Sequence, residues 1–300
     1  MKALVAVEMR RLLSRRLLRW LTVLALVGFA VAGTIAYVAS NDSPRAVTEA
    51  DARYEADLRG CISHAHQATG EMPPEARANP EGFCEEQVWR SDPRFVYNEF
   101  DWVLSSLGIP LIMLGWLVGA SFVGAEWHSR TITTLLTWEP RRVRVLAAKA
   151  VAVVAVVFAW VLTLQAMFSA AMYPAAAFEG STAGLTSGWW SSFALLIVRT
   201  SALSALAATL GLSISAVGRN TAAALGIGFV YLALVESLIR GFKPQWVDWL
   251  IGDNVALFLV GPADVTHLTH SQAAAGLLLL AYAGAVFVFA LAVFRRREIA

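Results

Sequence analysis

The fold class is indicated most clearly by one long apolar run, residues 146–173, LAAKAVAVVAVVFAWVLTLQAMFSAAMY. Its 28 positions hold a single charged residue, Lys149. A helix of about 20 apolar residues crosses the hydrocarbon core of a bilayer, so the run is long enough to span a membrane. It lacks the period-2 alternation over roughly 10 residues that a membrane barrel strand shows, whereas a helix satisfies its backbone hydrogen bonds internally. We therefore expect a transmembrane helix here.

The composition of the whole chain agrees with a membrane protein. Hydrophobic residues make up 57% of the chain and charged residues 15%, whereas roughly a quarter of the residues in a soluble domain are charged. Five more apolar runs flank the first, and the six predicted spans are residues 20–40, 102–124, 146–173, 189–217, 221–239 and 273–294. The predicted fold class is an all-α polytopic membrane protein with six transmembrane helices.

The segments outside the spans differ in character. Residues 1–19 form a basic amphipathic helix, residues 41–101 and 240–272 are expected outside the membrane on its outer side, and residues 295–300 form a tail. The first apolar run, of about 19 residues, is longer than the 7 to 15 residues of a signal-peptide core. We therefore interpret it as a retained span rather than a cleaved signal.

The basic residues predict the orientation, because membrane insertion keeps Lys and Arg on the cytoplasmic side. They gather before the first span, after the second, after the fourth and after the last: Lys2, Arg10, Arg11, Arg15, Arg16, Arg19, Arg130, Arg141, Arg142, Arg144, Lys149, Arg219, Arg295, Arg296 and Arg297. We expect a multi-pass protein of the cell (plasma) membrane with both termini in the cytoplasm. The basic N-terminal helix can also attract anionic lipid, although topology alone explains its charges.

The outer segment 41–101 has the opposite charge, with 13 acidic residues against 6 arginines. The formal net charge of +2 hides this asymmetry, and no nucleic-acid partner is expected. Cys61 and Cys84 both lie in this segment, and cysteines on the oxidising side of a membrane usually pair. The alternative is a metal site that adds His64 and His66, but their spacing matches no standard zinc pattern. The sequence predicts a disulfide and no metal.

Three polar residues, Gln165, Arg199 and Glu236, lie within apolar spans. At a rise of about 1.5 Å per residue, all three fall at similar heights in the outer leaflet. A charge at that depth is expensive unless it is paired, so Arg199 and Glu236 can face each other. The alternative is that both reach the nearby outer interface by snorkelling.

Glycine and proline predict two further local features. Gly115 and Gly119 form a GxxxG pattern that favours close helix packing, and Pro110 should bend the same helix. In the outer segment 240–272, the residues 252–254 split two short apolar pieces, 246–251 and 255–260. Neither piece can span a bilayer, so they predict a re-entrant pair of short helices that could form an outer gate.

No catalytic motif is present in the sequence. A P-loop needs a lysine followed by Ser or Thr, but Lys2, Lys149 and Lys243 are followed by Ala, Ala and Pro. No HExxH zinc site or GxSxG nucleophile elbow occurs either. We expect no catalytic residues, no enzyme activity and no cofactor in this chain.

Residues 126–149, EWHSRTITTLLTWEPRRVRVLAAK, are the charged amphipathic stretch between the second and third spans. On a helical wheel one side carries Trp127, Ile132, Leu135, Leu136 and Trp138, and the other carries Glu126, Ser129, Arg130, Thr133 and Thr137. The apolar side suits the membrane and the polar side suits a soluble partner.

This stretch resembles the type 2 ABC-transporter permease family, particularly its short actinobacterial members. The resemblance rests on Glu126 and Trp127 at the exit of the second span, then Thr131, the Leu135–Leu136 pair, Pro140, Arg141, Arg142 and Lys149. Arg130 stands where that family commonly has Gly. The six spans, the basic N-terminal helix and the broken outer connection also agree with it.

The resemblance implies a membrane subunit that forms a homodimer and binds two copies of an ATPase subunit, which holds ATP and Mg²⁺. Residues 125–145 would be the coupling helix and its loop. The residues expected to contact the ATPase are Glu126, Trp127, Arg130, Thr131, Thr134, Trp138 and Arg141. The second and fifth spans would line the pathway of an exported small molecule, lipid or peptide, with Pro110, Met113, Trp116, Phe229 and Tyr231 as candidates.

One alternative of a different class stays open. A membrane sensor or immunity protein could use the outer segment around Cys61 and Cys84 to bind a ligand without transporting it. A haem or metal redox protein is disfavoured because no paired histidines lie inside the spans.

Overall fold

The computed structural model describes residues 1–67, 79–89, 91–263, 265 and 267–296, and only the backbone of Thr133 and Leu136. The expected places of the Leu136 and Thr133 side chains on the helical wheel therefore lie outside the described structure. So do residues 297–300 of the predicted tail.

The six expected spans are present as helices long and apolar enough to cross a membrane, so the fold class is confirmed. They are α2 (Arg16–Ala39), α6 (Phe100–His128, after the 3-10 turn η1, Tyr97–Glu99), α8 (Arg142–Glu179), α9 (Ser187–Gly218), the fifth span and α13 (Gln272–Arg296). The fifth span is continuous through α10 (Thr221–Val230), the π-helical turn η2 (Tyr231–Val235) and α11 (Glu236–Phe242). The helices extend beyond the apolar runs because polar residues at a membrane surface remain compatible with helix.

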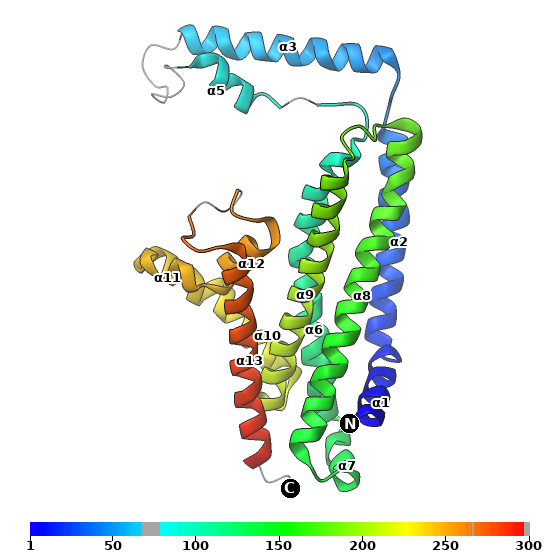
Figure 1. Cartoon of the computed structure of the whole chain (residues 1–300), viewed down its shortest axis with the longest axis vertical. Coiled ribbons are helices and arrows are strands. Elements are labelled where there is room, and N and C mark those ends of the chain that lie inside the picture. Colours follow the sequence, from blue (N-terminus) through cyan, green and yellow to red (C-terminus); the bar gives the residue numbers. More distant parts are fainter. Residues whose placement is uncertain (68–78, 90, 264, 266, 297–300) are drawn as a thin grey trace. The chain divides into compact units, whose positions relative to one another are not determined.

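The contacts divide the chain into two compact units, which are described separately. Unit 1 contains residues 1–26, 101–167 and 190–300, and unit 2 contains residues 27–100 and 168–189. In unit 1, the helices α1 (Lys2–Leu13) and α7 (Thr131–Trp138) and the last turn of α13 lie at the same end (Figure 1). We call this the basic end, because it carries Arg10, Arg11, Arg15, Arg142 and Arg296.

The core of unit 1 follows from the small residues that line α6 and α9. A Cβ added at Gly115 or Gly119 of α6 would overlap the carbonyl oxygen of Ser204 or Ala208 on α9. A Cβ at Gly211 of α9 would in turn overlap the Trp116 carbonyl oxygen. The predicted GxxxG pattern therefore packs within the chain, backbone against backbone, and Pro110 lies inside α6 without ending it.

Unit 2 contains the outer segment. Its helices α3 (Pro44–Gln67) and α5 (Pro80–Gln87) are joined by a disulfide between Cys61 and Cys84, as predicted (Figure 1). The alternative metal site is wrong, because both cysteines bond to each other and His64 Nδ1 lies 2.9 Å from the Gly60 carbonyl oxygen. Tyr97, buried among aromatic rings, donates from its hydroxyl to the Ser169 carbonyl at 2.9 Å.

Two predicted boundaries are wrong. The N-terminal helix 1–19 is broken between α1 and α2 at Ser14 and Arg15, because the Arg15 side chain leaves the helix surface to bind carbonyl groups of α6. The outer connection breaks at Leu250 rather than at 252–254: a 3-10 helix, η3 (Pro244–Trp249), precedes α12 (Ile251–Val260). Gly252 remains helical because its N–H donates to Glu236 at 2.9 Å, which satisfies a free N–H of the first turn.

The α6–α9 contact predicts that Gly119→Leu destabilises the protein, because the new side chain has no room beside the Ala208 carbonyl. We expect the free energy of unfolding to fall by at least about 2 kcal/mol. The matched control is Gly284→Leu, since a Cβ at Gly284 of α13 meets nothing within 4 Å. Unfolding of the purified protein in detergent compares the two variants. Equal stability of both would contradict the packing described here.

Candidate functional site

A buried ion cluster lies at the basic end of unit 1. Lys149, in the first turns of α8, is 0% exposed. Its Nζ donates to Glu8 Oε2 of α1 at 2.7 Å and to Glu126 Oε1 of α6 at 2.8 Å. The ammonium group also lies 4.7 Å from the centre of the Phe122 ring. One lysine therefore connects α6 and α8 to α1, whose Glu8 lies 141 positions before it in the sequence.

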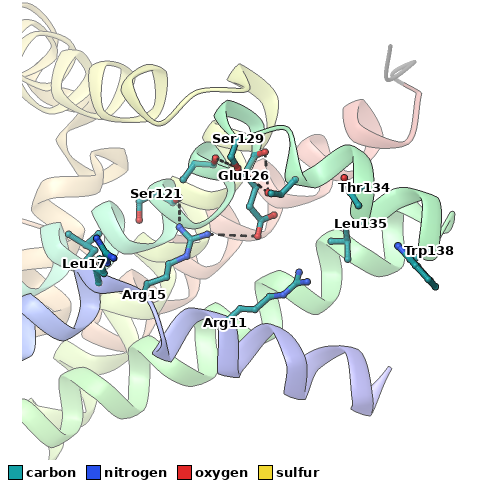
Figure 2. Close-up of a pocket in the computed structure, with 12 residues that line it drawn as sticks. Arg11, Arg15, Leu17, Ser121, Glu126, Ser129, Thr134, Leu135 and Trp138 are labelled. Carbon is teal, nitrogen blue, oxygen red and sulfur yellow. Dashed lines mark hydrogen bonds and ion pairs between the residues drawn. The ribbon is translucent and has the colours of Figure 1, made fainter.

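Arg15 extends this cluster from the break between α1 and α2. Its guanidinium donates to the carbonyl oxygens of Ser121 and Phe122, both at 2.9 Å, and lies 3.8 Å from Glu126 Oε1. Burial lowers the pKa of Arg15, while the charges of Glu126 and Glu8 raise it. The side chain stays charged, because an arginine pKa begins far above neutral pH. Figure 2 shows Arg15 directed at Glu126 and Ser121.

The cluster holds three helices of the basic end together by charge. Removing one partner of a buried ion pair typically costs 3–5 kcal/mol, because the other charge is left uncompensated. Here Lys149 compensates two carboxylates at once, and Glu8 is 0% exposed. α1 is therefore held against the exit of α6 and the start of α8 by charge as well as by the burial of Leu12 in the core of unit 1.

The chain turns sharply between α6 and α7. α6 ends at His128, and Arg130 adopts a left-handed conformation with φ 57° before α7 begins at Thr131. Glycine adopts this conformation without strain, so the backbone at Arg130 is one that favours glycine. Ile132 of α7 is buried in the core, whereas Thr131, Thr134 and Trp138 are exposed.

A groove opens beside the cluster. It has a volume of about 970 Å³ and lies between the α1–α2 junction and α6–α7. Figure 2 shows the labelled side chains around it. The groove is lined by Arg11, Arg15, Arg16, Leu17, Ser121, Ala125, Glu126, Ser129, Thr131, Thr134, Leu135 and Trp138.

The structure brings together only some of the expected coupling residues. Glu126 is buried inside the ion cluster, so the expectation that it is offered to a soluble partner is wrong. Trp127 packs on the ring of Phe294 at 6.2 Å between centroids, and Arg219 lies over its ring at 5.0 Å. Trp138 is 85% exposed while Trp127 is half-buried, so the two tryptophans have different surroundings within the chain, and their placement on one membrane side stays a prediction.

The remaining expected coupling residues stay on the surface. Thr131, Thr134, Trp138, Arg130 and Arg141 are exposed at the basic end, on α7 or directly beside it. They are the side chains that a partner can reach.

A second charged network lies at the opposite end of unit 1. The carboxylate of Glu236, 2% exposed, accepts from the Gly252 N–H and from Arg240 at 3.1 Å. Arg240 also binds Asp253 at 3.0 Å, and His267 Nε2 lies 3.3 Å from the other oxygen of Asp253. The network joins α11 to α12, so it fixes the short outer helix against the fifth span.

Arg199 and Glu236 do not form the predicted pair. Arg199 lies 6.0 Å from the centre of the Phe258 ring, whereas Glu236 binds Arg240, one helical turn away on its own helix. The pair was one of two arrangements expected from the sequence, and similar depth does not determine which cation is nearest: Arg240, one turn along α11, binds Glu236 instead. Gln165 is buried and donates to the Ile197 carbonyl at 3.3 Å, which joins α8 to α9.

The pathway candidates lie on α6 and the fifth span. Pro110, Met113 and Phe229 are exposed, and Trp116 and Tyr231 are half-buried. A Cβ at Gly228 would lie 2.8 Å from the Trp116 ring, so the two helices are close at this point. The lining of a pathway by these residues stays a prediction.

Sequence reasoning missed Glu8 and Arg15 as cluster members. Two signals were available. Glu8 is the only acidic residue among the first 19, and Lys149 is the only lysine inside a predicted span. An isolated charge among residues of the opposite sign or among apolar residues needs a partner. The sequence does not show that Glu8 and Lys149 are partners of each other.

Comparison with family models gives a match over most of the chain. A family model described as "Protein of unknown function (DUF2705)" matches residues 92–300, which include every helix from α6 to α13. α1, with Glu8, and the disulfide-bonded outer helices precede the matched region. A search of curated proteins finds no match.

The contacts of Glu236 predict the residue to which it is energetically coupled. In double-mutant cycles with glutamine substitutions, Glu236→Gln and Arg240→Gln should show a coupling of about 0.5–3 kcal/mol, because the two side chains are in contact. Glu236→Gln and Arg199→Gln should be additive within about 0.5 kcal/mol. Unfolding of the four proteins of each cycle measures both values. A larger coupling to Arg199 would contradict the observed pairing.

Proposed function

The chain belongs to the DUF2705 family of proteins of unknown function, and we propose that it is the membrane-spanning permease subunit of an ABC transporter. A separate ATPase subunit would bind ATP and Mg²⁺, and this chain would carry the conformational change across the membrane. The cargo would be a small molecule, lipid or peptide, and the direction would be export.

The observation that carries this proposal is the way α7 is attached. α7 is a short helix whose Thr134 and Trp138 side chains are exposed, while Ile132 is buried in the core. It directly follows α6, which is bonded through Glu126 to Lys149 at the start of α8. A partner that pushes on α7 would therefore push on two spans, α6 and α8, as well as on α1 through Glu8. This arrangement suits the transmission of force from a soluble motor.

The arrangement also supports a cytoplasmic location of the basic end. Positive residues are concentrated there, and Lys and Arg are kept on the cytoplasmic side during insertion. An ATPase operates where ATP is available, which is the same side. Both termini would then be in the cytoplasm of a cell whose plasma membrane holds the protein.

A second copy of the chain would complete the pathway. The fifth span is largely uncovered by its own chain, and Phe229, for example, is 71% exposed. Lipid can cover such a face, but a homodimer that joins α6 and α10 of two copies would place Met113, Trp116, Phe229 and Tyr231 beside a central route.

A sensor or immunity protein is the second candidate, and one observation favours it. The acidic outer helix α3 is tied to α5 by the Cys61–Cys84 disulfide, which is a rigid attachment for a ligand-binding segment. This candidate gives no role to the exposed α7 or to the charges that fix it, so we favour the permease.

The proposal predicts a stable complex with a P-loop ATPase encoded beside this chain. Co-expression followed by affinity purification should recover both subunits. Trp138→Ala should lower the recovered ATPase about tenfold or more, because exposed tryptophans at an interface often contribute 1.4 kcal/mol or more.

The matched control is Trp20→Ala, which removes another exposed tryptophan, on α2. It should leave the recovered amount unchanged. Failure of the unmodified chain to recover the ATPase, or equal losses in the two variants, would contradict the proposal.

A further inference from the structure

The groove at the basic end has the charge of an anion site. Three arginines, Arg11, Arg15 and Arg16, and one glutamate, Glu126, line it. Behind it, Lys149 and Glu8 are buried and bonded to each other, so their charges cancel. The groove therefore keeps an excess of positive charge, which favours a negatively charged occupant.

Two of the arginines have donors available for a ligand. Arg15 is already engaged with the carbonyls of Ser121 and Phe122. Arg16 is exposed and has no hydrogen bond or ion pair with the described residues, and the Arg11 side chain is 50% exposed although it also contacts Glu8. A guanidinium binds a phosphate through two parallel N–H groups, so a pair of such groups is suited to a phosphodiester.

The position of the groove selects a lipid rather than a soluble anion. Leu17 belongs to the span α2, and Ser121 lies seven residues before the end of the span α6 at His128. At about 1.5 Å per residue, the groove reaches roughly 10 Å inward from the end of α6. In a membrane-spanning α6 this part of the groove lies beside the end of the apolar segment 102–124, where lipid headgroups and their glycerol groups lie in a bilayer.

The apolar part of the lining agrees with this position. Leu17, Ala125 and Leu135 face the same groove as the arginines, and Trp138 lies at its edge with 85% of its surface exposed. Tryptophan is enriched at membrane interfaces because its ring suits the headgroup layer. Arginines and an apolar wall side by side match a lipid that carries a phosphate and an acyl chain.

We propose that this groove binds an anionic phospholipid, with its phosphodiester at Arg11 and Arg16 and the first part of its acyl chains against Leu17 and Leu135. The lipid then joins the α1–α2 junction to α7 across the groove. The site does not require the chain to be a permease. If it is one, the lipid lies beside the helix that contacts the ATPase and regulates their coupling.

The test is native mass spectrometry of the full chain from mixed micelles of phosphatidylglycerol and phosphatidylcholine. The unmodified chain should retain phosphatidylglycerol preferentially. Each of Arg11→Gln and Arg16→Gln should lower this retention about fivefold, and the double variant about thirtyfold, because one basic residue near an anionic lipid contributes about that much.

Matched controls lie on the same helices. Arg10→Gln and Arg19→Gln remove exposed arginines of α1 and α2 that do not line the groove. The control pair should change retention less than twofold. Equal losses in the two pairs would show general surface attraction and overturn the site. The double variant Arg11→Lys with Arg16→Lys keeps both positive charges but lacks the planar guanidinium groups. Its retention of phosphatidylglycerol should lie between that of the unmodified chain and that of the glutamine double variant.

Three further results would overturn the proposal. The first is that the unmodified chain shows no preference for phosphatidylglycerol. The second is that inorganic phosphate displaces the lipid, which would show a site for free anions. The third is that the glutamine double variant loses ATPase recovery while its lipid retention is unchanged. The last result would assign the groove to the ATPase. The melting temperature of each variant, measured alongside, identifies a variant that fails to fold.

Discussion

The buried ammonium group of Lys149 is the interaction on which the basic end of the protein depends. It neutralises Glu8 and Glu126, which are contributed by α1 and α6 while the lysine belongs to α8. None of these charges is stable alone in an apolar environment, so the three helices are favoured together or not at all. The position of α7 follows, because it is joined to α6 by a turn of only a few residues.

The opposite end of unit 1 uses the same principle with different residues. Glu236 is buried, and its carboxylate accepts from Arg240 and from the first turn of α12. Between the two ends, the helices approach closely through small residues instead of charges, as at Gly119 and Ala208. The two charged networks therefore lie at opposite ends of unit 1, and small residues pack the helices between them.

Much of the fold could be predicted from the sequence, because a membrane limits the possible structures. An apolar run such as 146–173 has no alternative to a helix once it lies in lipid. The Cys61–Cys84 disulfide was also predictable, since a chain with only two cysteines has one possible intramolecular pairing. The break at Leu250 was not predictable. In the sequence, residues 252–254 have the composition of a helix breaker, but in the structure Glu236 of α11 accepts from the Gly252 N–H and the helix includes them.

The candidate site was predicted less well than the fold. Residues 126–149 were correctly expected to contain a short helix, but Glu126 was expected to face a partner and is buried. The periodicity of one helix cannot show which of its polar residues has a partner on another. That information comes from tertiary contacts, here from Lys149 on α8 and from Arg15, 111 positions before Glu126 in the chain.

The most direct test of the central claim is the distance between α1 and α7, measured between spin labels at Val7→Cys and Thr134→Cys. Both positions are exposed, and the native cysteines are bonded to each other. A single narrow distribution is expected, and Lys149→Met should broaden or shift it, because Glu8 and Glu126 lose the buried ammonium group that bonds to both. The control Lys243→Met changes an exposed lysine and should leave the distribution narrow. Identical distributions in the two variants would contradict the role assigned to Lys149.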